Sequence, residues 1–128
     1  MSYGLRYAKE LLSAAERHAE MGLYGVACFE ARQAALSALS YLNAYSSSSV
    51  REAYHEVISR GGKRDPEVMY CAAVLDNLYI MTKDACDDAC SDELPGGEEA
   101  YDATEGDARD AIKCATTILN YVMRSLTR

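Results

Sequence analysis

The segment that most constrains the fold is residues 24–45, YGVACFEARQAALSALSYLNAY, in which Glu30 and Arg32 are the only charged residues. A helix that is apolar on nearly every side must be enclosed by other elements. The segment therefore predicts the central helix of a helical bundle. Small residues also recur along it at spacings of four, three and four, which lets a neighbouring backbone approach closely; they are Ala27, Ala31, Ala34 and Ala38.

Gln33 is the uncharged polar residue that stands out in this helix, because it lies between Phe29 and Leu36 in an apolar stripe. A buried side-chain amide has four hydrogen-bonding sites that need partners. Two interpretations stay open. Gln33 is either a core glutamine whose partners satisfy it, or a contact to a ligand.

Four further helices are expected around the central one, because apolar residues recur at spacings of three and four in each. The expected ranges are residues 3–21, 50–60, 66–82 and 105–126. Three of them have a start signal: a capping box at Ser49, a cap followed by proline at Asp65, and a capping box at Thr104. No strand alternation exceeds chance. The prediction is an all-α, up-and-down bundle of about five helices in a single domain, residues 1–128.

A long acidic loop is expected before the last helix. Residues 84–110 hold eleven acidic residues against Arg109 alone, whereas the rest of the chain carries a small positive surplus. Residues 83–103 show no sustained periodicity and predict an unusually long loop. The loop is either a solvated connection or a docking contact for a partner. The charge distribution disfavours sequence-independent binding along a DNA or RNA duplex.

The five cysteines fall into two groups. Cys28, Cys71 and Cys114 lie in helical apolar patterns and are expected to be ordinary core residues. Cys86 and Cys90 share the polar loop, and their spacing is too wide for the usual zinc knuckle. No metal and no cofactor are therefore expected, while a disulfide from either of these two cysteines stays open.

Membrane spanning and secretion are not expected. No apolar run approaches the roughly eighteen residues of a transmembrane helix, and no charged-then-apolar leader opens the chain. The sequence therefore favours a cytoplasmic protein.

Several short strings in these helices occur in a fixed order along nearly the whole chain. They are Tyr24-x-x-Ala27, Ala31-Arg32-Gln33-Ala34, His55 in a short helix, Leu75-Asp76-x-x-Tyr79-Ile80-x-Thr82-Lys83, and Ala108-x-x-Ala111-Ile112. In this order and spacing the chain resembles the HEPN domain family, named for higher eukaryotes and prokaryotes nucleotide-binding. The resemblance implies a bundle of about five helices that pairs as a homodimer.

The resemblance also implies a function on or beside nucleotides or RNA, together with a partner nucleotidyltransferase in a toxin–antitoxin-like system. Two alternatives are a non-catalytic protein-interaction module and a metal-independent ribonuclease toxin. The chain departs from the family after Ile80, where threonine, arginine, tyrosine and proline are usual and residues 82–85 here read TKDA.

Arg51 and His55, one helical turn apart, are the candidate catalytic residues. Histidine suits removal of the 2'-hydroxyl proton near neutral pH, and arginine holds the charge that grows on the phosphorus oxygens. The ribonucleases of the family separate these two residues by more positions than the three found here. In the alternative interpretation, Arg51 pairs with Glu52, Glu56 or the acidic loop, and His55 caps a helix or touches a tyrosine.

Lys83, Tyr54 and Gln33 are the candidate nucleotide or RNA contacts. A tyrosine ring such as that of Tyr54 is suited to stack on a base, but it also suits a core edge or a dimer seam. His18, the only other histidine, is expected to be a surface residue.

Overall fold

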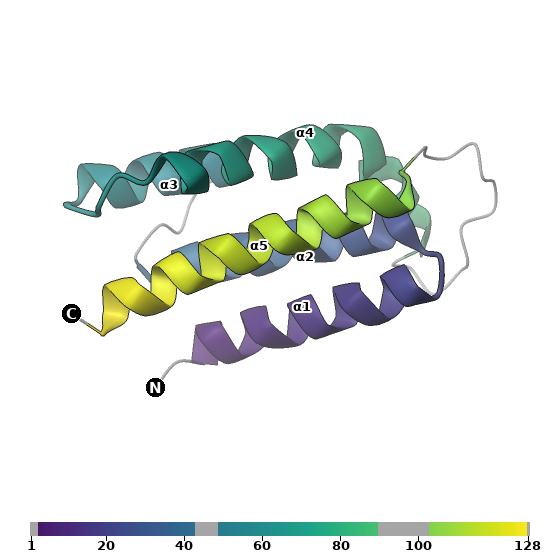
Figure 1. Cartoon of the computed structure of the whole chain (residues 1–128), viewed down its shortest axis with the longest axis horizontal. Helices are drawn as coiled ribbons and strands as arrows, with labels where there is room; N and C mark the ends of the chain where they lie inside the picture. Colours follow the sequence, from purple (N-terminus) through teal and green to yellow (C-terminus); the bar gives the residue numbers. More distant parts are fainter. Residues whose placement is uncertain (1–2, 43–48, 90–102, 128) are drawn as a thin grey trace.

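The computed structural model describes residues 3–42, 49–89 and 103–127. Within these ranges the protein is a bundle of five α-helices without strands, as predicted (Figure 1). The helices are α1 (Tyr3–Glu20), α2 (Tyr24–Ser40), α3 (Val50–Ser59), α4 (Pro66–Ala89) and α5 (Glu105–Leu126). None of the described helices is both long enough and apolar enough to cross a bilayer.

The central position predicted for α2 is confirmed, because all four other helices pack against it. Its alanine stripe is fully enclosed, with Ala27, Ala31 and Ala38 at 0% exposure. The helix ends at Ser40 rather than at residue 45, and residues 43–48 lie outside the described part of the chain. The core combines these small residues with Leu39 of the same helix and with larger residues from the surrounding helices, including Leu75 and Ile118.

The local start signals are confirmed at three helices. The Ser49 hydroxyl accepts a hydrogen bond from the Glu52 N–H at 3.1 Å. Thr104 and Asp107 form a reciprocal capping box, with both bonds at 3.1 Å. The Asp65 carboxylate accepts bonds from the first two free N–H groups inside α4. Each cap satisfies donors that a helix leaves without an internal partner, so the sequence alone located these starts.

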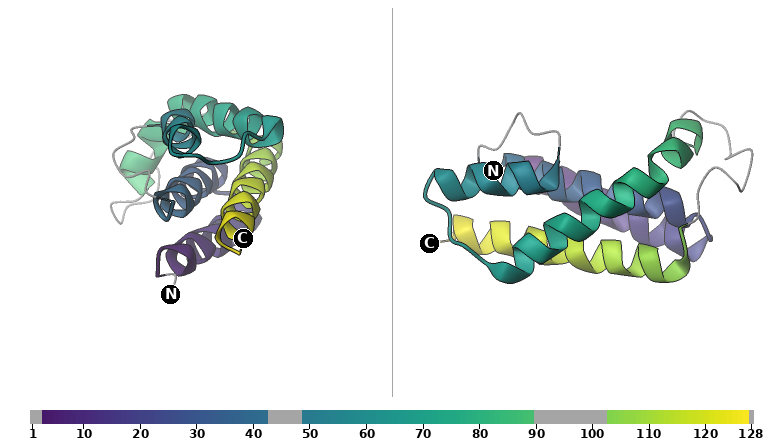
Figure 2. Two further views of the ribbon diagram at one scale, coloured as in Figure 1. Left: turned by 90° about the vertical axis from the view of Figure 1, so that its left-hand side faces the viewer. Right: turned by 90° about the horizontal axis from the view of Figure 1, so that it is seen from above.

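The expected end of the fourth helix was wrong. α4 continues to Ala89, so residues 83–89 are helical and not part of a loop. These residues contain no glycine or proline, so nothing in their backbone chemistry ends the helix, although the apolar periodicity has stopped. Figure 2 shows this helix crossing obliquely over the bundle. Residues 90–102, which include Cys90 and most of the acidic loop, lie outside the described residues.

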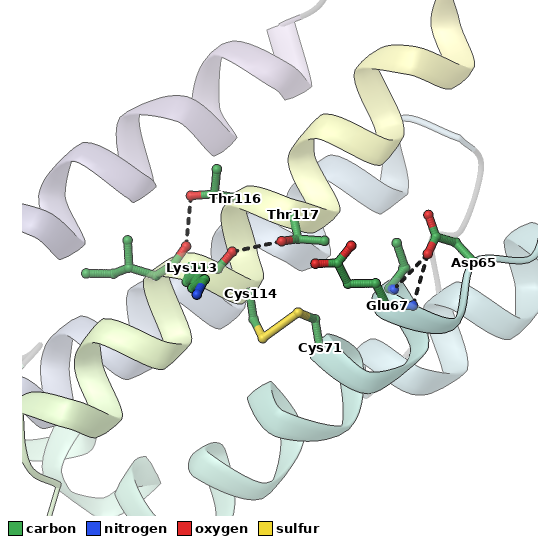
Figure 3. The surroundings of a disulfide bond; sticks show 9 residues. Asp65, Glu67, Cys71, Lys113, Cys114, Thr116 and Thr117 are labelled. Atoms are coloured by element: carbon green, nitrogen blue, oxygen red, sulfur yellow. Dashed lines mark hydrogen bonds between the residues drawn. A yellow bond between two sulfur atoms is a disulfide. The ribbon is translucent and has the colours of Figure 1, made fainter.

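The three cysteines expected in the core are buried there, but the disulfide that joins two of them was not expected. Cys71 of α4 and Cys114 of α5 form a disulfide, with their Cα atoms 4.8 Å apart (Figure 3). Helical periodicity places both residues on inward faces but does not say which inward residues meet. Cys28 is a buried free thiol as expected, and burial, with the charges of Asp107 and Asp110, raises its pKa to about 12.

Candidate functional site

The polar centre of the described structure is Asp76 on α4, which is only 6% exposed. Its Oδ1 accepts a hydrogen bond from the Val50 N–H at 2.9 Å, and its Oδ2 accepts one from the Arg51 N–H at 3.0 Å. These are the first N–H groups of α3, where a carboxylate is stabilised by both the free donors and the helix dipole. A side chain of α4 therefore fixes the start of α3.

Two guanidinium groups contact the same carboxylate. Arg32 of α2 places Nε 3.4 Å from Oδ1 of Asp76, and Arg51 of α3 places Nε 3.5 Å from Oδ2. The Arg32 side chain is 6% exposed, and its Cζ lies 4.0 Å from the centroid of the Tyr79 ring. A buried charge is tolerated when it is paired in this way, and the ring face adds a cation–π contact. We call Arg32, Asp76 and Arg51 the carboxylate triad.

The carboxylate triad carries one net positive charge, and that charge reaches the surface at Arg51. Arg32 is enclosed, whereas the Arg51 side chain is 51% exposed. His55, one turn further along α3, is also exposed, so the two candidate catalytic residues do share an open helix face. The carboxylate of Asp76 is a partner for Arg51 that the sequence analysis did not consider. Glu56 instead pairs with Arg60 at 3.0 Å.

Of the three remaining candidate contacts, the structure describes the side chains of two, Tyr54 and Gln33, and neither is fully exposed. Tyr54 is 1% exposed and packs edge-on against Tyr121, so its ring has no free face for a base. Gln33 is half-buried on α2, and the buried polar residue of that helix is Arg32. Lys83 lies within α4, but its side chain is outside the described part of the structure.

His18 is more than the surface residue that was expected. Its Nδ1 lies 2.8 Å from Oε1 of Glu30, which connects α1 to α2, and its side chain is 31% exposed. Where the structure is described, no three side chains of His, Cys, Asp or Glu converge closely enough to hold a metal ion.

Sequence analysis missed the link between Arg32 and Asp76, although the signal was present. Arg32 lies in an alanine-rich helix, and Asp76 lies between Leu75 and Leu78 on an apolar face. Two opposite charges on inward faces of different helices are expected to neutralise each other, since an unpaired buried charge is very costly.

The sequence profile of the HEPN domain matches residues 1–126, nearly the whole chain. The chain belongs to the HEPN domain family. Three solved structures are similar to this HEPN chain. An HEPN domain protein from Thermotoga maritima is 26% identical, with 98% of each chain covered and a TM-score of 0.71. A protein from Thermus thermophilus is 28% identical, with 94% of each chain covered and a TM-score of 0.77.

The third structure, an archaeal HEPN homologue, shares the fold with a TM-score of 0.65 at 24% identity, covering 95% of this chain and 93% of the other. No curated protein matches the sequence significantly. In this HEPN domain, two of the strings that carry the family resemblance supply the buried ion pair of Arg32 with Asp76 and the ring of Tyr79 beside it. The result is a fixed, half-exposed guanidinium one turn from an exposed imidazole, which is suited to hold a phosphate group.

Proposed function

We propose that this HEPN domain binds nucleotides or RNA through the α3 face that carries Arg51 and His55, and that it does so without cleaving the phosphodiester. The observation that supports the proposal best is the placement of Arg51. Its Nε is engaged by the buried Asp76 carboxylate, while half of the side chain remains open to solvent. A guanidinium whose orientation is already restrained by an ion pair loses less conformational entropy when it binds a phosphate oxygen.

Binding is favoured over cleavage by the surroundings of the two residues. Arg51 shares its charge with Asp76, which weakens its ability to stabilise a developing negative charge. Among the described residues, no side chain is hydrogen-bonded to the His55 ring, whereas a catalytic base is normally oriented by a third group. The ribonuclease function is therefore the second candidate and is tested below.

The proposal includes a homodimer and a nucleotidyltransferase partner in a cytoplasmic toxin–antitoxin-like system, as the family resemblance implies. Large apolar side chains exposed on the described surface are consistent with such contacts. Tyr70 on α4 is 67% exposed and Tyr7 on α1 is 54% exposed. Size-exclusion chromatography with light scattering tests the homodimer, and co-elution with a nucleotidyltransferase encoded by a neighbouring gene tests the partner.

The binding role is tested by fluorescence anisotropy of a labelled single-stranded RNA with the Arg51→Gln and His55→Ala variants. Arg32 still neutralises Asp76 when Arg51 is replaced, so the variant is expected to fold. Loss of a charge-assisted contact should weaken binding by about tenfold. Arg6→Gln is the matched control, because Arg6 is an exposed arginine on α1 that pairs only with Glu10 among the described residues. Wild-type affinity in Arg51→Gln would reject the proposal.

A second assay separates binding from cleavage. The wild-type protein and His55→Ala are incubated with the same RNA in the presence of a metal chelator, and the products are resolved by electrophoresis. We expect intact RNA in both samples. Cleavage that disappears in His55→Ala would instead establish the ribonuclease alternative. Failure to bind RNA, combined with co-elution of a protein partner, would favour the interaction module.

A further inference from the structure

The turn between α3 and α4 lies at one end of the bundle, where the C-terminal end of α5 also lies (Figure 2). The side chains there line a basic depression. Its first lobe has a volume of about 270 Å³ and is lined by Lys63, Arg64, Asp65, Tyr121, Arg124 and Ser125. A second lobe of about 260 Å³ shares Lys63 and Ser125 with the first and adds Arg60 and the two turn glycines. We call the two lobes together the turn pocket.

The turn pocket carries more positive than negative charge. Asp65 faces Arg124 at 3.7 Å, and Glu56 pairs with Arg60 at 3.0 Å. Lys63 and Arg64 are both exposed, and within the described residues neither has a carboxylate within ion-pair distance. Four cations against two carboxylates leave a surplus of two positive charges at this end of the molecule.

Two buried tyrosines fix the backbone that presents these cations. The Lys63 carbonyl accepts hydrogen bonds from the Tyr121 hydroxyl at 2.7 Å and from the Tyr54 hydroxyl at 3.2 Å. The Asp65 N–H in turn donates to the Tyr54 oxygen at 2.6 Å. The chain is thus held on both sides of Arg64, so the turn pocket has its shape without a ligand and loses little conformational entropy on binding.

The glycines of the turn are required by its geometry. Gly61 has a φ of 99°, a conformation that other residues adopt only with strain. A Cβ at Gly62 would lie 2.5 Å from Cγ1 of Val57 and 2.7 Å from its carbonyl oxygen. The close approach of the turn to α3 is therefore possible only because Gly62 lacks a side chain.

Helix dipoles account for some of the cations but not for all. Arg60 and Arg124 lie at the C-terminal ends of α3 and α5, where a positive charge is favourable without any ligand. Lys63 and Arg64 directly precede the N-terminus of α4, which begins at Pro66. A positive charge is unfavourable there, so stability alone does not explain these two residues.

We propose that the turn pocket binds an anion made of two or more linked phosphates. A surplus of two charges suits a polyanion better than a single carboxylate, and the planar guanidinium groups match the spacing of phosphate oxygens. The two lobes joined at Lys63 provide room for more than one phosphate. This site lies at the opposite end of α3 from Arg51 and does not depend on the function proposed for that residue.

A second basic depression on the protein provides a control. The outer face of α1 has a larger hollow of about 520 Å³ that is lined by Arg6, Lys9 and Arg17, among others. All of its lining residues come from α1, and no turn or other helix of the described residues contributes to the lining. The turn pocket and the α1 hollow are thus both basic, but only the turn pocket includes a turn whose backbone is fixed by hydrogen bonds.

The experiment is isothermal titration calorimetry of the purified protein with sodium pyrophosphate and sodium tripolyphosphate, with a metal chelator present. We expect tripolyphosphate to bind more tightly, and Arg64→Gln and Lys63→Gln each to weaken binding by about tenfold. In an Arg51→Gln background, which removes the phosphate contact proposed on α3, the double variant should show no measurable heat of binding. Both side chains are exposed, so circular dichroism should report an unchanged fold. The matched control is the double variant Arg6→Gln/Lys9→Gln.

Three results would overturn the proposal. They are an absence of tripolyphosphate binding by the wild-type protein, equal weakening by the α1 control, and binding of single-stranded RNA without binding of tripolyphosphate. Comparing ATP with tripolyphosphate shows whether the source of the phosphates matters: equal affinities identify phosphate itself as the ligand, and tighter ATP binding identifies a nucleotide. In an Arg51→Gln background, Lys63→Gln and Arg64→Gln should still weaken tripolyphosphate binding, which separates this site from the one proposed on α3.

Discussion

The two ends of α3 are held by different chemistry. At its N-terminal end the tie is ionic, because the buried Asp76 carboxylate binds two helix N–H groups and the guanidinium of Arg32. At its C-terminal end the tie is neutral, because the hydroxyls of Tyr54 and Tyr121 bind the backbone of the α3–α4 turn. The same short helix is thus fixed by buried charge at one end and by buried hydroxyls at the other.

The difference determines what each end presents to solvent. In the ionic tie, one positive charge is balanced by the buried carboxylate, and the other remains exposed to solvent on Arg51. The neutral tie involves no charged side chain, so Lys63 and Arg64 beside it stay exposed to solvent. The ionic tie should also be the more sensitive to substitution. Removing one of its partners leaves a buried charge without that counter-charge, whereas removing one hydroxyl costs a single hydrogen bond.

The largest expected effect is that of Asp76→Ala. The variant leaves the guanidinium of Arg32 buried without its carboxylate and removes the acceptor for the first N–H groups of α3. We expect a loss of about 3–5 kcal/mol in the free energy of unfolding. Urea denaturation followed by circular dichroism measures this loss.

Arg51→Gln is the matched control, because it removes the half-exposed partner of the same carboxylate and leaves Arg32 in place. It should cost less than about 1 kcal/mol, as is typical of solvent-exposed ion pairs. Similar losses in Asp76→Ala and Arg51→Gln would contradict the view that the buried half of the carboxylate triad carries its stability.

The bundle and its helix starts were predictable from the sequence because both depend on local patterns. Apolar periodicity identified the helices, and the caps at Ser49, Asp65 and Thr104 require only residues that are neighbours in the chain. The end of α4 was missed for a related reason. Its last residues lack apolar periodicity, yet nothing in their backbone chemistry stops the helix.

The candidate site was predicted less well because it depends on contacts between distant residues. Arg51 and His55 were placed on one exposed face, since a single helical turn relates them. The pairing of Arg32 with Asp76 and of Cys71 with Cys114 joins residues on different helices, and periodicity does not give the register between helices. Such pairs were detectable only as chemically unusual residues on inward faces.

An intermediate effect is expected from reduction of the disulfide between Cys71 and Cys114. These residues are 43 positions apart, and cross-links of this kind typically contribute about 2–4 kcal/mol. The experiment also sharpens the comparison, because α4 carries Asp76 and follows the turn that contains Lys63. If each end of α3 is held by its own contacts, reduction should lower the stability of the wild-type protein and of Asp76→Ala by similar amounts.

Urea denaturation with and without a thiol reductant measures the effect, and the double variant Cys71→Ala/Cys114→Ala is insensitive to the reductant as a control. A much larger loss on reduction in Asp76→Ala than in the wild-type protein would mean that the ionic tie and the covalent tie support each other. In that case the N-terminal end of α3 could not be treated separately from the contact between α4 and α5.

The smallest effect is expected from Tyr121→Phe at the neutral end, and its size depends on pH. Near neutral pH the Lys63 carbonyl keeps its bond to the Tyr54 hydroxyl, so the variant should lose only about 1 kcal/mol. Burial raises the pKa of both tyrosines above their ordinary value of 10.0. Stability from the protonated hydroxyls is therefore complete below pH 10 and is lost as the pH rises from there toward the raised pKa values.

Urea denaturation between pH 8 and about pH 11 should consequently show a shallower alkaline loss in Tyr121→Phe than in the parent protein, since one of the two titrating hydroxyls is gone. The parent should be a Cys28→Ala variant, because the thiol of Cys28, with its pKa raised to about 12, produces a similar loss that begins at lower pH. Tyr7→Phe is the control, as Tyr7 is 54% exposed. Equal slopes for Tyr7→Phe and Tyr121→Phe would show that the turn is not held by protonated hydroxyls, and the neutral tie would then have to come from packing of the rings alone.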